Sequence, residues 1–225
     1  MLFFMALQLI FVDPIVGESS SFVHDLGQNK PAFEQDKNQL QDELGIRSWQ
    51  VWIQKGPGSS RYSIQQIECQ EPERLLERFS SAVSRKNSYA CWLSEVFLRA
   101  LSSECYLMNP ASTIEEVLDL DIDPGYPGAG FEFCYTLPLL PGKREDQVEY
   151  CRAAMNEKQE QTIAACKAFR MVDMKKWIQQ SPGGDYVLYH EHLSLPVQEA
   201  RELFLSFSND PKALQATKTL REQSG

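Results

Sequence analysis

The chain contains an internal repeat, and this feature constrains the fold more than any other. Segment 52–58 reads WIQKGPG and segment 177–183 reads WIQQSPG, so five of the seven positions are identical at a constant shift of 125 residues. Beyond the turn, the second half is one residue shorter, and the alignment continues at a shift of 124 residues. The further matching pairs are Tyr62 with Tyr186, Pro72 with Pro196 and Ser84 with Ser208. Matches in this order predict two head-to-tail copies of one structural unit.

Both halves predict the same order of secondary structure. An apolar strand is followed by a helical stretch with apolar residues at every third or fourth position. Two strands joined by a turn with glycine and proline form a hairpin, and two helices follow. The predicted strands are Phe3–Val12, Ile46–Gln54 and Arg61–Glu68 in the first half, and Phe131–Leu140, Met171–Gln179 and Asp185–His192 in the second. The predicted last helices are Ser88–Leu101 and Pro211–Glu222.

This β-α-β-β-α order in each half predicts an α+β chain with two repeats. We place the first repeat at residues 1–105 and the second at residues 131–225. Residues 106–130 are predicted to form an acidic linker, because prolines and glycines interrupt them. For a fourth strand, the first half offers only Glu104–Met108 as a candidate.

The two halves resemble the dimeric α/β-barrel superfamily of ferredoxin-like domains, which includes the antibiotic-biosynthesis monooxygenases. The resemblance rests on the order of elements and on the Trp-Ile-Gln and Pro-Gly residues of each hairpin. It is nearest to members with no assigned activity. It implies that two ferredoxin-like repeats pack their antiparallel sheets as an intrachain pseudo-dimeric α/β barrel. It therefore implies a monomer and not an obligate homodimer.

Charge and cysteine content narrow the class of protein. The formal net charge is −9, whereas nucleic-acid binding needs a cationic surface, so we expect no nucleic-acid partner. The six cysteines form no CxxC pair, which predicts reduced thiols and favours the cytoplasm. Met1–Val12 is apolar but lacks the basic start of a signal peptide and is too short to span a bilayer. We predict a buried strand there and no membrane partner.

Strand alternation points to a candidate ligand site, because successive side chains face opposite sides of a sheet. The apolar face of the second strand carries Val172, Met174 and Ile178 in the second half and should pack on helices. The opposite face should line the space between the two sheets, where a small apolar or aromatic molecule could bind. The predicted ligand-binding residues are Trp52, Gln54, Gln66, Asp173, Lys175, Trp177, Gln179, His190 and His192. In the alternative, the two tryptophans pack on each other and the glutamines bond locally.

His190 and His192 alternate on one strand and so share a face. Two such imidazoles can hold a metal or haem iron when a third ligand, here Asp173 or Glu68, converges on them. Nothing in the sequence shows this convergence. We therefore predict no cofactor and treat both as surface or edge residues, with haem or a metal as the alternative.

The sequence contains no spacing typical of a nucleophilic triad, so catalytic residues stay unassigned. We expect a barrel protein that binds a small molecule or simply assembles, without established catalysis. The alternative is a cofactor-independent monooxygenase or a haem-handling enzyme of the same superfamily.

Overall fold

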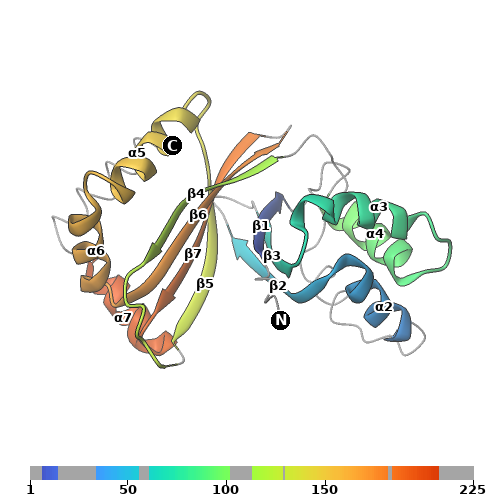
Figure 1. Ribbon diagram of the computed structural model, residues 1–225, viewed down its shortest axis with the longest axis horizontal. Helices are drawn as coiled ribbons and strands as arrows, with labels where there is room; N and C mark the ends of the chain where they lie inside the picture. Colours follow the sequence, from blue (N-terminus) through green and yellow to red (C-terminus); the bar gives the residue numbers. More distant parts are fainter. Residues whose placement is uncertain are drawn as a thin grey trace, which may run out of the picture. The chain divides into compact units, whose positions relative to one another are not determined.

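The computed structural model describes residues 7–14, 34–55, 61–101, 113–128, 130–181 and 184–207. The chain divides into two compact units. Unit 1 comprises Met1–Thr113 with Ser181–Gly183, and unit 2 comprises Ile114–Gln180 with Gly184–Gly225. Each unit combines a sheet with helices (Figure 1). The predicted α+β class is confirmed.

The sheet of unit 1 has three strands in the order β1-β3-β2. The outer strands β1 (Leu7–Pro14) and β2 (Ile46–Lys55) both pair antiparallel with the central strand β3 (Arg61–Cys69). These bounds agree with the predicted strands to within a few residues. The side chains of β1 lie outside the described residues, so the predicted burial of that strand stays a prediction.

The helices of unit 1 are α2 (Glu34–Leu44), α3 (Leu75–Val83) and α4 (Tyr89–Ala100), and they lie together on one side of the sheet (Figure 1). A 3₁₀ turn at Pro72–Arg74 precedes α3, as expected for a proline at the start of a helix. Phe97 of α4 is fully buried and contacts the ring of Trp49 in β2 at a centroid distance of 6.1 Å. The helix layer and the sheet therefore share one core.

The sheet of unit 2 has four strands in the order β4-β6-β7-β5. Their bounds are Thr113–Asp121 for β4, Phe131–Pro138 for β5, Met171–Ser181 for β6 and Gly184–Leu193 for β7. β5 pairs antiparallel with β7 along its whole length. The first, third and second strands of each predicted repeat are thus neighbours in the same order, β1-β3-β2 and β5-β7-β6.

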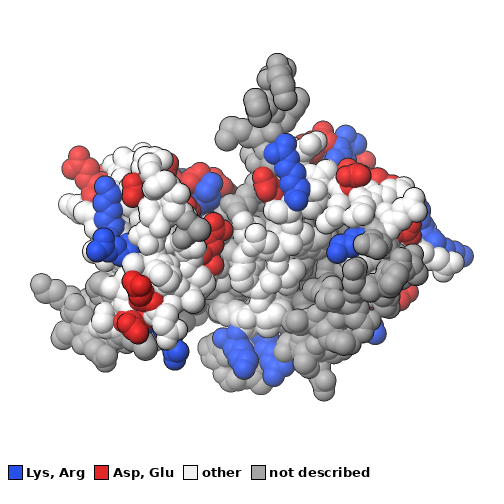
Figure 2. Space-filling model, turned by 90° about the horizontal axis from the view of Figure 1, so that it is seen from below, with Lys and Arg blue, Asp and Glu red and all other residues white. Residues whose placement is uncertain are grey.

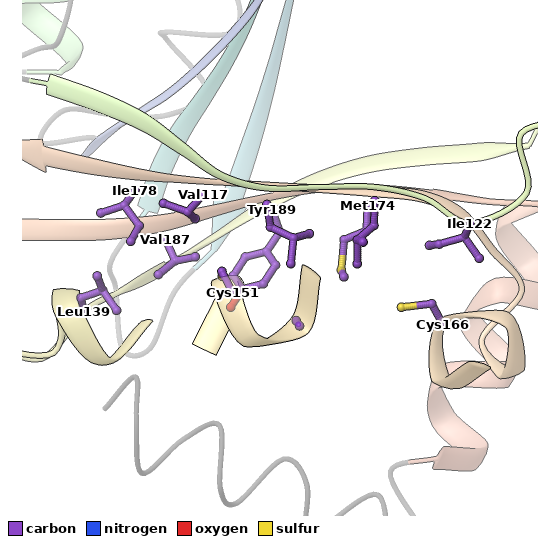
Figure 3. Close-up of a cluster of buried hydrophobic side chains, with 12 residues drawn as sticks. Val117, Ile122, Leu139, Cys151, Cys166, Met174, Ile178, Val187 and Tyr189 are labelled. Carbon is purple, nitrogen blue, oxygen red and sulfur yellow. The ribbon is translucent and has the colours of Figure 1, made fainter. Parts of the chain in front are cut away.

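The helices of unit 2 are α5 (Arg144–Met155), α6 (Gln159–Ala168) and α7 (Val197–Phe207). The helical stretch predicted after β5 is thus two helices, because Asn156 ends α5 with its side-chain amide bonded to the Arg152 carbonyl at 2.9 Å. Helices α5 and α6 cover one face of the sheet (Figure 1). An apolar core lies between these helices and the sheet, and Ile178, Val187 and Cys151 contribute to it (Figure 3).

One turn has the same geometry in both units. Gly45 follows α2 and Arg170 follows α6, and both have the left-handed φ that glycine adopts most easily, +65° and +58°. These positions are also 125 residues apart. The carbonyl of each accepts a hydrogen bond from the residue after the third strand, Gln70 at 3.2 Å and Ser194 at 2.8 Å. The two units therefore share this local structure as well as the strand order.

Strand β4 corrects the prediction that residues 106–130 form only a linker. Leu118 and Leu120 are buried in the core of unit 2, because β4 adds to the sheet beside β6. Prolines and glycines flank this strand, and because such residues are typical of loops, the whole segment was predicted to be a linker. The candidate strand Glu104–Met108 and the predicted helix Pro211–Glu222 lie outside the described residues.

Several surface cations of the described residues form ion pairs with carboxylates. Arg144 bonds to Glu115 at 2.6 Å, and Arg85 bonds to Glu43. On the face in Figure 2, positive and negative side chains are interspersed. Five of the cysteines fall in the described ranges and all five are free thiols, as predicted, whereas Cys105 lies outside these ranges. In the same ranges, no helix has the length and apolar character needed to cross a membrane.

Candidate functional site

A cavity of about 420 Å³ lies in unit 2, between the sheet and helices α5 and α6. Its wall is mostly apolar and aromatic, but it contains the amines of Lys158 and Lys176 and the carboxyl group of Glu191. The lining residues are Tyr135, Leu137, Tyr150, Lys158, Gln161, Thr162, Ala165, Cys166, Phe169, Met171, Met174, Lys176, Tyr189 and Glu191. Figure 3 shows Tyr189 and Met174 projecting from the sheet toward the helices. We call this cavity the tyrosine pocket.

Lys176 is the buried amine of the tyrosine pocket. Its side chain leaves β6 on the helix side, and only 5% of the residue is exposed. The ammonium nitrogen lies 4.8 Å from the ring centroid of Tyr189 and 5.4 Å from that of Tyr150. Among the described residues no carboxylate lies within ion-pair distance of it. Burial lowers the pKa of Lys176, and the negative charge of Glu191 opposes this only in part.

Glu191 is the buried acid of the pocket. It extends from β7 on the helix side, with 4% exposed, and accepts a hydrogen bond from the Tyr135 hydroxyl at 2.8 Å. Burial raises the pKa of the Glu191 carboxyl, while the bond from Tyr135 and the charge of Lys176 partly offset that rise. Its proton affinity therefore lies above that of an exposed glutamate.

Tyrosine rings form one wall of the pocket. The rings of Tyr135 and Tyr189 are stacked at a centroid distance of 4.5 Å and an interplanar angle of 3°. Burial raises the pKa of both phenols, so both are protonated at neutral pH. Burial likewise raises the pKa of Cys166, which keeps that residue a thiol. The wall thus offers flat aromatic surface, and Lys176 and Glu191 are its main proton-exchanging groups.

Four predicted site residues occupy the opposite face of β6. Trp177 is almost fully buried, and its indole donates a hydrogen bond to Glu116 of β4. Lys175 forms an ion pair with Asp119 of β4 at 3.1 Å. Gln179 is buried, and Asp173 lies near the two histidines. These side chains do not line the tyrosine pocket.

His190 and His192 lie on the same face of β7, as alternation predicted. The Nδ1 atom of His192 lies 3.2 Å from Asp173, and the ring of His190 lies 3.6 Å from Glu132 and 3.8 Å from Asp173. Burial lowers the pKa of His190, against the opposing charges of Asp173 and Glu132. Within the described ranges, no group of three or more His, Cys, Asp or Glu residues has an arrangement that could hold a metal ion. Because β7 is an inner strand and His190 is 6% exposed, the prediction of a surface or edge residue is wrong for His190. The haem or metal alternative stays a prediction.

The remaining predicted residues belong to the sheet of unit 1. Trp52 is half-buried opposite Ile64, and Gln54 is half-buried opposite Tyr62. Gln66 is buried in the central strand. All three lie on the face opposite to Trp49, which packs on α4. A ligand bound between the two sheets stays a prediction.

The residues that form the tyrosine pocket were not predicted, although the sequence contains a signal for two of them. Lys176 interrupts the apolar alternation of Val172, Met174 and Ile178 on β6, and Glu191 similarly follows Val187 and Tyr189 on one face of β7. A charged residue on an apolar strand face is costly unless it has a function or a partner. The pocket residues on α5 and α6 have no such signal, because their positions depend on how these helices pack on the sheet.

Comparisons with known proteins bear on the fold. No protein-family model matches the chain, and no curated protein matches it. A crystal structure titled as a study of an anthrone oxidase-like protein is similar to it, with a TM-score of 0.51 and 11% sequence identity. The similarity covers 97% of this chain and 86% of the other. It supports the ferredoxin-like α+β fold that the sequence resemblance implied, and at this identity it shows the fold alone.

Proposed function

We propose that unit 2 binds a small aromatic molecule with a carbonyl or phenolic oxygen and exchanges a proton with it. The observation that carries this proposal is the location of Lys176 and Glu191 in the wall of the tyrosine pocket. Both are buried charged residue types, and such residues in a cavity with shifted pKa values are typical of functional sites. The proposed site is on the helix side of the unit 2 sheet, whereas the six predicted residues of this unit lie on its opposite face.

The shape and lining of the pocket support an aromatic ligand. A volume of about 420 Å³ falls in the range of small-molecule sites. The parallel rings of Tyr135 and Tyr189 provide a flat surface, and flat rings stack on such surfaces with a gain beyond simple burial. The Lys176 amine can donate a hydrogen bond to a ligand oxygen, which orients the ring system.

Glu191 supports the proton-transfer part of the proposal. A carboxyl group with a raised pKa is a stronger base than an exposed glutamate when ionised, and a usable acid when protonated. The Tyr135 hydroxyl fixes one of its oxygens at 2.8 Å, which leaves the other oxygen for a ligand. A positive charge on Lys176 would stabilise the enolate or phenolate that proton removal produces.

A second candidate function is the oxidation of an aromatic compound by dioxygen without a bound cofactor. The similarity to a protein titled anthrone oxidase-like favours it. In this reaction Glu191 would take a proton from a CH₂ group beside the rings, and the carbanion would pass electrons to dioxygen. The CH₂ group becomes a carbonyl group, and one dioxygen is consumed for each water released.

We also propose that the two units are tandem copies of one ferredoxin-like repeat. The shared strand order supports this, as does the left-handed turn at Gly45 and Arg170. The location of Trp52 and Trp177 on the second strand of each unit agrees with it.

The test uses 1-naphthol as a binding probe and anthrone as a proton-exchange substrate. We expect calorimetry to detect 1-naphthol binding, and NMR in D₂O to show faster exchange of the anthrone CH₂ protons with the wild-type protein. Glu191→Gln should slow the exchange by about 100-fold or more while binding persists, because the base is lost and the shape is kept. Glu132→Gln, an exposed change on the opposite face of the sheet, is the matched control.

Absence of 1-naphthol binding would exclude the tyrosine pocket as an aromatic site. Exchange that is equally fast in Glu191→Gln would exclude Glu191 as the base. An oxygen electrode in the same assay separates the two candidate functions, because proton exchange alone consumes no dioxygen.

A further inference from the structure

We propose that Lys176 is a nucleophile that forms an imine with an aldehyde or ketone in the tyrosine pocket. This proposal rests on the proposed function, because the same pocket must admit an aromatic carbonyl compound. It goes further in assigning a covalent intermediate and in restricting the substrate class to reactive carbonyl compounds.

The surroundings of Lys176 differ from those of other described cations. Lys175, the adjacent residue, is 30% exposed in its side chain and pairs with Asp119. Arg144 and Arg85 likewise pair with carboxylates at the surface. Lys176 is 5% exposed and faces tyrosine rings. An amine buried in this way is desolvated, which is the usual means of activating a lysine as a nucleophile.

The lowered pKa of Lys176 agrees with this geometry, because the neutral amine carries the lone pair that attacks a carbonyl carbon. The two tyrosine rings favour the charged amine. Desolvation acts in the opposite direction and is the largest cause of the shift in the pKa of Lys176. Two other groups of the pocket are poorer candidates. Cys166 is held as a thiol by burial, and Lys158 is exposed.

The proposed step balances with groups of the pocket. The Nζ lone pair of neutral Lys176 attacks the carbonyl carbon, and a C–N bond forms. A proton moves from the amine to the former carbonyl oxygen, which gives a carbinolamine. Protonated Glu191 then donates its proton to the hydroxyl group, the C–O bond breaks, and water leaves. The products are an iminium ion on Lys176 and the Glu191 carboxylate, which can remove a proton from the carbon beside the iminium.

Benzoylacetone is the probe for this step, because it is an aromatic 1,3-diketone that yields a stable, light-absorbing enaminone with an activated lysine amine. We expect the wild-type protein to gain near-ultraviolet absorbance and one adduct per chain by intact mass. Peptide fragmentation should locate the adduct at Lys176. In a parallel experiment, borohydride reduction with 2-naphthaldehyde should fix the same residue.

The variants are Lys176→Met, which should lose the adduct, and Lys175→Met, which should keep it. Circular dichroism shows whether each variant is folded, and 1-naphthol binding shows whether the wild-type protein and Lys175→Met have an intact pocket. Since 1-naphthol has no carbonyl group, it reports on the proposed function independently of the imine. Binding of 1-naphthol without any adduct at Lys176 would overturn this inference alone. An adduct that persists in folded Lys176→Met, or that spreads over several surface lysines, would also overturn it.

Discussion

At the scale of single residues, the tyrosine pocket depends on two side chains that interrupt apolar strand faces. Lys176 and Glu191 both extend from the sheet toward α5 and α6, where their neighbours are mostly carbon. Burying a charge without a close ion-pair partner destabilises a fold, so Lys176 reduces the stability of unit 2. Residues retained at such a cost are expected at functional sites.

Replacement of Lys176 by methionine tests this cost. The pKa of Lys176 in the folded chain is below its ordinary value of 10.5. Between these two values only the unfolded chain binds the proton, so wild-type stability rises with pH across that window. Below the lowered pKa, the full cost of the buried ammonium remains. We therefore expect Lys176→Met to raise the free energy of unfolding by about 1–2 kcal/mol at neutral pH, and by less near pH 10.5.

Urea unfolding at neutral pH and at the upper end of the window measures both values. Lys175→Met is the control, because its exposed ion pair should contribute less than about 1 kcal/mol. A loss of stability in Lys176→Met at both pH values would show that packing of the lysine against Tyr150 and Tyr189 outweighs the cost of its charge.

The sequence contained the signal for Lys176 and Glu191 but not for the pocket itself. Alternation correctly placed Met174 and Ile178 toward the helices, and the same rule applies to Lys176. The predicted site lay on the opposite face, because tryptophan and glutamine recur there at matching positions of both halves. Tyr150 and Cys166 reach the pocket only through the docking of α5 and α6, which local periodicity does not specify.

At the scale of elements, β4 is the strand that amino-acid composition failed to predict. The strand Thr113–Asp121 carries acidic residues beside apolar ones and lies between proline-containing segments, so it resembled a linker. In the structure Leu118 and Leu120 pack in the core, and Lys175 of β6 pairs with Asp119. The strands that form hairpins were predicted well, because their turns and alternation are local. The partner of β4 is β6, which begins 50 residues after β4 ends. Pairing at that separation produces no local sequence pattern that could predict the strand.

Substitution of Leu118 by alanine tests whether β4 is an integral strand. Leu118 is 1% exposed, so we expect Leu118→Ala to lower the free energy of unfolding by about 2–4 kcal/mol through lost burial and a residual cavity. Asp121→Ala, at an exposed position of the same strand, should change it by less than about 0.5 kcal/mol. Urea unfolding followed by circular dichroism gives both numbers. A loss below about 0.5 kcal/mol for Leu118→Ala would mean that residues 113–121 behave as a linker.

At the scale of the whole molecule, the proposed duplication allows corresponding positions of the two units to be compared. A shift of 125 residues relates Lys176 to Val51, and the shift of 124 that follows the hairpin relates Tyr189 to Gln65 and Glu191 to Ile67. Unit 1 therefore has neither the amine nor the acid at these positions. Its Gln65 is fully buried and accepts a hydrogen bond from the Trp49 indole at 3.1 Å. The duplication would thus leave one copy with the proton-exchanging pair and the other without it.

We therefore expect one molecule of 1-naphthol per chain and not two, because only unit 2 has the pair that can orient a phenolic oxygen. Calorimetric titration measures this ratio, and light scattering in the same buffer gives the mass to which it refers.

Tyr189→Leu removes half of the stacked ring pair and should weaken binding by about 10-fold, in line with the energy of one aromatic contact. Val51→Ala changes the corresponding strand of unit 1, at a position 37% exposed, and should leave the affinity unchanged. A ratio of two, or an equal loss of affinity in both variants, would contradict a single site in unit 2.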